Sequence, residues 1–247
     1  MSTGSRFVIL AAPRTGSNLL CTLLNSHPEV LCHHELFNPH GIFYALECRD
    51  GSLNLGDMEA RDRDPFRFLQ RVWDSARGAS CVGFKMTRGQ HEEVMHGLIG
   101  DSDVRKILLH RRNRLKTYVS EQIAMRTDRW EVYSRKDLAT DVPRINVDIE
   151  SFMAHCDQNE RFYRSIETAL RSGEQPWIRT FYEGLHDVDE HIRLLEFIGV
   201  QATQTRLTDA SIKQSDRDLR SHIQNFRELE RRFRGTEYLA ELHDDEN

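Results

Sequence analysis

Short apolar runs and amphipathic stretches alternate along most of the chain. Continuous apolar runs predict buried strands, and apolar residues spaced three or four apart predict helices that bury one face. The pattern predicts strands at residues 6–12, 30–32, 81–86, 104–110 and 176–183. It predicts helices at residues 17–26, 65–77, 91–99, 115–126, 149–170, 186–198 and 216–233. Because strands alternate with helices, we expect an α/β fold of three layers, with a mostly parallel central sheet and helices on both faces.

Two stretches, near residues 38–64 and 127–147, lack this periodicity and are rich in polar residues. We interpret them as loops or lids within a single domain that spans residues 1–247. Ligands of such sheets bind where parallel strands end, so the residues just after each predicted strand are the first candidates for a site.

Composition and charge exclude several classes of protein. The 247 residues suffice for a sizeable core, and a net charge of −5 gives no reason to expect a nucleic-acid partner. No apolar run reaches the length of an integral membrane segment, and the first apolar run lacks the basic flank of a signal peptide. The five cysteines are odd in number and form no C-x-x-C pair, so we expect free thiols, a cytoplasmic location and no metal site.

The first predicted strand is followed by the sequence PRTGSN, which has the features of an anion-binding loop. A glycine permits a tight turn, and the amides at the start of the next helix can then point at a negative group. The lysine of the G-x-x-x-x-G-K-[ST] loop of nucleotide hydrolases is missing. Candidate anion ligands in this loop are Arg14, Thr15, Gly16, Ser17 and Asn18.

A second basic stretch, RRNRLKTYVS, follows the strand predicted at residues 104–110. Ser120 lies eight residues after Arg112, about two helical turns, so the two side chains do not share one face of a regular helix. If the helix begins after Arg112, both side chains can converge on one anion. Taken alone, this stretch is better explained as a solvated basic face.

In their order and spacing, these two stretches resemble the two signatures of sulfotransferases that use 3′-phosphoadenosine 5′-phosphosulfate (PAPS). Further similar segments are HHELFN, the strand end GFK, the strand end YEGL and the C-terminal stretch IQNFRELERRFRGTEYL. The resemblance covers nearly the whole chain and is greatest to bacterial carbohydrate-type members. It implies that the first loop binds the 5′-phosphosulfate of PAPS, and that Arg112 and Ser120 bind its 3′-phosphate.

The resemblance also suggests catalytic residues. Arg14 stands where many members have lysine, and it would stabilise the negative charge on the leaving phosphate. Glu35 matches the glutamate that serves as general base in carbohydrate-type members, with His34 and then His33 as alternatives. Lys85 would stabilise the sulfuryl oxygens or contact the acceptor, although a strand-end lysine can also be purely structural.

Three further residues complete the predicted donor site. Tyr182 would lie near the adenine, and Lys213 and Gln214 would close over the nucleotide. The chain is thus expected to transfer a sulfuryl group from PAPS to a hydroxyl of a carbohydrate or glycolipid, leaving 3′,5′-adenosine bisphosphate (PAP). The alternatives are a small-molecule kinase with a degenerate phosphate loop and a nucleotide-binding protein without catalysis.

Overall fold

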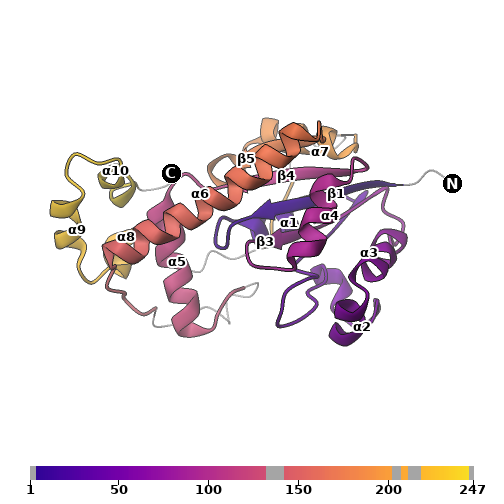
Figure 1. The fold of residues 1–247 in the computed structure, drawn as a ribbon, viewed down its shortest axis with the longest axis horizontal. Helices are drawn as coiled ribbons and strands as arrows, with labels where there is room; N and C mark the ends of the chain where they lie inside the picture. The colour runs from indigo at the N-terminus through magenta and orange to yellow at the C-terminus, as the bar shows by residue number, and fades with distance from the viewer. Residues whose placement is uncertain (1–3, 132–141, 202–206, 211–217, 245–247) are drawn as a thin grey trace.

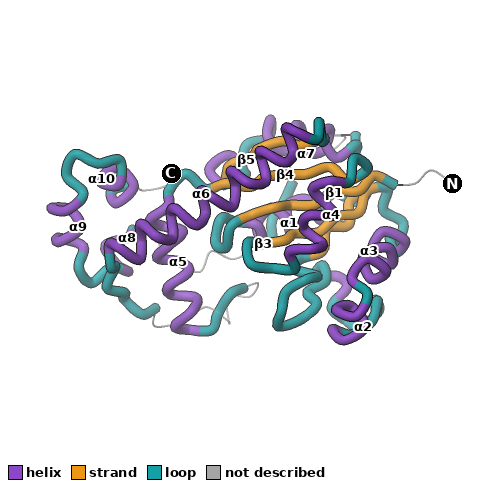
Figure 2. Tube along the Cα trace, viewed as in Figure 1, coloured by secondary structure: helices purple, strands orange, loops and turns teal. Residues whose placement is uncertain are grey.

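A computed structural model describes residues 4–131, 142–201, 207–210 and 218–244. Within these residues, five strands form one sheet in the order β2-β3-β1-β4-β5, and all four pairings are parallel. The sheet lies in the middle of the molecule, with helices around it (Figure 2). The strands are β1 (Ser5–Ala11), β2 (Val30–His33), β3 (Cys81–Thr87), β4 (Val104–His110) and β5 (Trp177–Phe181).

Each face of the sheet carries its own apolar core, because side chains alternate along the strands. From β1, Val8 and Leu10 pack in one core, which also holds apolar residues of α3 (Pro65–Asp74), α4 (Glu92–Gly100) and α6 (Ile149–Ser172). Phe7 and Ile9 pack in the other, with residues of α1 (Ser17–Asn25) and α7 (Val188–Ile198). The predicted three-layer α/β fold is therefore confirmed.

A third apolar cluster lies beyond the end of the sheet, on the side of the molecule away from the N-terminus (Figure 1). It joins α5 (Arg114–Thr127) and the first part of α6 to three short helices, α8 (Leu219–His222), α9 (Phe226–Arg232) and α10 (Tyr238–Leu242).

The prediction of one helix over residues 216–233 is wrong in the described part of that range. Ile223 is extended and pairs with Ile145, whose amide donates to the carbonyl of His222 at 2.8 Å. The side-chain amide of Asn225 also bonds to both backbone groups of Val147. These contacts with a distant segment break the helix between α8 and α9.

The segment at 38–64 is more ordered than its composition predicted. It contains a 3-10 helix, η1 (Leu46–Cys48), and a helix, α2 (Met58–Arg63). The buried Arg61 guanidinium donates to the carbonyls of Leu36, Asn38 and Gly41 at 2.9–3.1 Å, and so fixes the chain that follows β2.

The fifth strand is shorter than predicted. It ends at Phe181 and is followed by a 3-10 turn, η3 (Tyr182–Gly184). All five cysteines are free and buried. None of the helices in the described ranges combines the length and apolarity that crossing a bilayer requires.

Candidate active site

The loop between β1 and α1 turns sharply into the helix. Arg14 and Gly16 both have left-handed backbone, with φ of 62° and 93°. The buried Thr15 hydroxyl donates to the Ala12 carbonyl at 2.8 Å, which ties the turn to the strand end. Gly16 is the N-cap of α1, and none of the described side chains caps the first amides there. The amides of Ser17 and the residues after it are therefore available to an anion at this helix N-terminus, and anion binding by the loop stays a prediction.

Tyr182 explains why residue 16 is a glycine. A Cβ atom on Gly16 would lie 2.3 Å from Cδ2 of the Tyr182 ring. On this ring lies the Arg111 guanidinium, 4.3 Å from its centroid, and Arg111 also donates to the Arg14 carbonyl at 3.3 Å. The structure thus places Tyr182 directly against the loop after β1.

The Arg14 side chain connects three segments of the chain. Its Nε donates to Ser120 Oγ on α5 at 2.9 Å, and its Nη1 donates to the carbonyl of Trp130 at 2.7 Å. Burial and the nearby Arg111 lower the pKa of Arg14. A guanidinium whose ordinary pKa is above 12 stays charged after such a shift, so Arg14 remains a fixed cation.

Arg112 lies at the end of β4 and is largely exposed. Its guanidinium lies 4.3 Å from the centroid of the Phe181 ring and 3.9 Å from the Glu183 carboxylate. The backbone amide of Arg112 donates to the same carboxylate at 2.8 Å. Helix α5 begins only at Arg114, so Arg112 precedes the helix, as convergence with Ser120 requires. In the structure Ser120 hydrogen-bonds to Arg14, and its convergence with Arg112 on one anion stays a prediction.

A second group of charged residues, near the end of β2, lies next to α1. Lys85 is inside β3 rather than after it, and its side chain lies on the opposite face from Phe84. It forms an ion pair with Glu35 at 2.9 Å and donates a hydrogen bond to Asn18 Oδ1. His34 Nδ1 lies 3.4 Å from the same Asn18 oxygen. Asn18, at the start of α1, therefore connects the loop after β1 to the catalytic candidates.

The pKa shifts distinguish Glu35 from His34, the first alternative base. Burial raises the pKa of the Glu35 carboxyl, but Lys85 and hydrogen bonds from Asn38 and Gln90 outweigh it, so the pKa is lowered. Burial and the cations Lys85 and Arg49 lower the pKa of His34 to about 2. At neutral pH Glu35 is ionised and can accept a proton, whereas His34 is a neutral imidazole of very low basicity. The electrostatics favour Glu35.

Two residues that support the site carried no sequence signal. Tyr163 of α6 accepts a hydrogen bond from the amide of Ala12 at 2.8 Å and donates one to the carbonyl of Leu109 at 2.6 Å. It thereby fixes the ends of β1 and β4. Glu241 of α10 accepts from the amides of Arg114 and Leu115 at 2.7 and 3.0 Å, at the start of α5. Both contacts join residues far apart in sequence, and no local pattern marks them.

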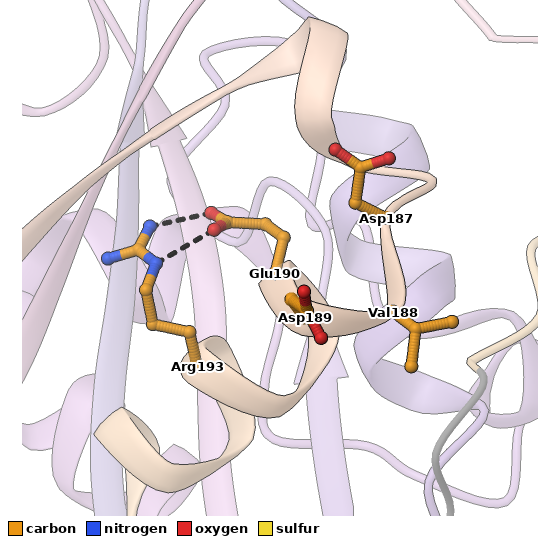
Figure 3. Close-up of a pocket in the computed structure, with 5 residues that line it drawn as sticks. All are labelled: Asp187, Val188, Asp189, Glu190 and Arg193. Carbon is orange, nitrogen blue, oxygen red and sulfur yellow. Dashed lines mark hydrogen bonds and ion pairs between the residues drawn. The ribbon is translucent and has the colours of Figure 1, made fainter.

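Lys213 and Gln214 lie outside the described residues. A surface hollow at the start of α7 is lined mainly by acidic side chains, and Arg193 there is directed at Glu190, with hydrogen bonds of 2.6 and 2.7 Å (Figure 3). Its acidic lining does not suit a phosphate. No group of three or more potential ligands that could hold a metal ion occurs in the described part of the chain.

Comparisons with known proteins place this geometry in context. Nodulation protein H of Rhizobium meliloti (strain 1021) is 30% identical over 239 residues, covering 94% of this chain and 92% of that protein. Nodulation protein H of Rhizobium tropici is 27% identical over 234 residues, covering 94% and 90%. The crystal structure of a sulfotransferase from Alicyclobacillus acidocaldarius has the same fold, with a TM-score of 0.51, 17% identity and coverage of 96% and 94%. No protein-family model matches the chain.

Proposed function

The chain belongs to the Nodulation protein H family, and from this premise we propose that it is a PAPS-dependent sulfotransferase acting on a carbohydrate-type hydroxyl. The observation that carries the proposal is the adjacency of two half-sites. An uncapped helix N-terminus with the cation Arg14 lies next to an ionised glutamate paired with Lys85, and Asn18 contacts both halves.

These residues fit the chemistry of sulfuryl transfer. Glu35 accepts the proton of the acceptor hydroxyl, whose oxygen forms a new bond to sulfur. The bond from sulfur to the bridging phosphate oxygen breaks in line with it, and the phosphate leaves with its negative charge. Arg14 and the amides at the start of α1 stabilise that charge. Such a transition state is loose, so positioning and fixed cations supply most of the catalysis.

Lys85 has two roles in this scheme. Its ion pair with Glu35 keeps the carboxylate ionised, and its contact with Asn18 holds it close to the loop that binds the donor. As an ammonium group beside the reacting centre, it also stabilises the sulfuryl oxygens. Its burial beside Glu35 favours these functional roles over a purely structural one.

On the donor side, we assign the 3′-phosphate to Arg112 and Ser120 and the adenine to the region of Tyr182. The aromatic packing of Arg112 on Phe181 and its contact with Glu183 support this assignment, because they hold the guanidinium at the carboxyl end of β4. We assign closure over the nucleotide to Lys213 and Gln214, from the sequence resemblance alone.

Thermal denaturation in the presence of nucleotides tests the donor class. We expect PAP to raise the melting temperature and ATP or AMP to raise it much less, because only PAP carries a 3′-phosphate as well as a 5′-phosphate. Stabilisation by ATP without stabilisation by PAP would overturn the proposal and favour a kinase.

Transfer from labelled PAPS to a panel of glycans and glycolipids tests the acceptor class. The motifs resemble those of the nodulation sulfotransferase that modifies a lipochitooligosaccharide, so a chitin oligosaccharide is the first acceptor to try. Transfer only to non-carbohydrate hydroxyls would overturn the acceptor assignment. The free, buried cysteines support a cytoplasmic location, which subcellular fractionation would test.

A further inference from the structure

The chain after α5 folds back onto the candidate active site. Asp128, the C-cap of α5, has a left-handed backbone with φ of 52°, which ends the helix. Two residues later, the carbonyl of Trp130 accepts the 2.7 Å hydrogen bond from Arg14. The backbone of residue 130 is therefore hydrogen-bonded to the cation that we assign to the donor phosphate.

The next residue, Glu131, lies close to the neighbour of Glu35, the proposed base. Its carboxylate lies 3.8 Å from Nδ1 of His34, the residue next to Glu35. Two nitrogens of Arg49 donate to one Glu131 oxygen at 3.2 Å, and Arg49 Nε donates to the carbonyl of Tyr44 at 3.0 Å. The Glu131 side chain is 22% exposed, so an approaching ligand can still reach the carboxylate.

Trp130 itself is 41% exposed, one of few large apolar side chains left open to solvent in the described residues. The exposed indole of a residue whose carbonyl bonds to Arg14 offers a flat apolar surface and an N–H donor. The carboxylate beside it offers strong acceptors for hydroxyl groups, and its charge is already balanced by Arg49. An aromatic surface with a few fixed polar groups is the usual make-up of a small-molecule site.

We propose that Trp130 and Glu131, held by Arg14 and Arg49, form the subsite that binds a sugar ring of the acceptor. The apolar face of the ring packs on the Trp130 indole, and ring hydroxyls donate to the Glu131 carboxylate. Arg49 is a positioning residue, because it acts through Glu131. This inference rests on the proposed function and adds to it the location of the acceptor.

Two variants of Trp130 test the aromatic surface. Trp130→Ala should raise the KM for a chitin tetrasaccharide about tenfold or more, since it removes most of the covered apolar area. Trp130→Phe should restore most of the loss. Both variants keep the backbone carbonyl that bonds to Arg14, so PAP should stabilise them as it stabilises the wild type. Phe66→Ala, which removes an aromatic side chain that is 44% exposed on α3, is the matched control and should leave KM unchanged.

Glu131→Gln tests the polar half of the subsite. It keeps the shape of the side chain and removes the charge, and we expect a severalfold rise in KM for the tetrasaccharide with PAP binding unchanged. Arg49→Ala should raise KM in the same way, and Arg49→Lys should rescue it in part.

Direct binding separates this inference from the proposed function. Binding of the tetrasaccharide to the PAP complex is followed by calorimetry, without any transfer step. Weaker binding by Trp130→Ala supports the subsite even if the wild type transfers no sulfate, in which case the proposed function fails alone. Sulfate transfer with an unchanged KM in Trp130→Ala and Glu131→Gln overturns the subsite and leaves the function standing. Equal losses of PAP and sugar binding also overturn it, because they indicate a structural role.

Discussion

Substitution of Gly16 by alanine adds a single atom, the Cβ, to the loop between β1 and α1. Two costs follow from the structure. A residue with a Cβ at φ 93° loses about 1 kcal/mol of conformational free energy. The new Cβ would also lie 2.3 Å from the Tyr182 ring, which must move, and such overpacking costs about 1–3 kcal/mol.

Together these costs lower the free energy of unfolding by about 2–4 kcal/mol. For a chain of this length each kcal/mol shifts the melting temperature by about 2–4 °C, so Gly16→Ala should melt roughly 4–16 °C below the wild type. Thermal denaturation, followed by circular dichroism without nucleotide, measures the shift. The same scan with PAP should show little stabilisation, because the displaced ring and the altered turn would no longer fit the donor in the proposed site.

Gly78→Ala isolates the first cost. Gly78 has φ of 90°, almost the same as Gly16, but a Cβ built there meets nothing within 4 Å. Gly78→Ala should lower the free energy of unfolding by about 1 kcal/mol and the melting temperature by roughly 2–4 °C. Adding Tyr182→Ala to Gly16→Ala should cost less than the sum of the two single changes, since the clash is then absent. Equal melting temperatures for Gly16→Ala and Gly78→Ala would refute the argument that the Tyr182 ring packs on the loop.

Other substitutions test individual roles. Glu35→Gln should keep PAP affinity and lower kcat by about 10²–10⁴, measured with labelled PAPS; an unchanged kcat would exclude Glu35 as the base. Lys85→Met removes the cation that lowers the pKa of Glu35, so burial should shift the acid limb of the kcat/KM profile to higher pH; a limb that stays in place would contradict this coupling. Arg112→Ala should weaken PAP binding in calorimetry far more than AMP binding, and Glu183→Gln should do so to a smaller degree. Equal losses for both nucleotides would remove Arg112 from the 3′-phosphate.

Much of the fold could be predicted because the strands are buried on both faces. The strand at 104–110 was predicted with its observed bounds, and β1 within one residue at each end. Parallel strands then bring their carboxyl ends to one edge, so the sequence positions of Arg14, Glu35 and Arg112 predict that they lie at the same edge of the sheet. Helix N-caps can also be predicted, because they depend on residues close in sequence. Asp64 accepts a hydrogen bond from the Arg67 amide at 3.0 Å, as expected for an N-cap.

The rest depended on contacts between distant segments. The end of α8 is set by Ile145, 78 residues before Ile223, and not by any helix-breaking residue. The contact of Arg14 with Trp130 spans 116 residues and uses a backbone carbonyl, which every residue has. Periodicity and side-chain type carry no information about such partners, so the proposed acceptor subsite could not be derived from the sequence.

Two buried or half-buried cations, Arg14 and Lys85, each touch both halves of the site. Arg14 lies in the loop after β1 and bonds to the carbonyl of Trp130, and Lys85 contacts Asn18 of α1 and pairs with Glu35. Replacing either cation should therefore disturb the proposed donor and acceptor sites together. The kinetics of such a variant cannot assign the residue to one of the two sites. Arg112 lies on the proposed donor side only, and Glu131 lies on the proposed acceptor side only. Changes in KM for variants of these two residues can therefore be assigned to one substrate. The shared cations also give a physical reason for the order in the site: Arg14, proposed to stabilise the leaving phosphate, also bonds to the backbone of the proposed sugar subsite, and Lys85 pairs with the proposed base.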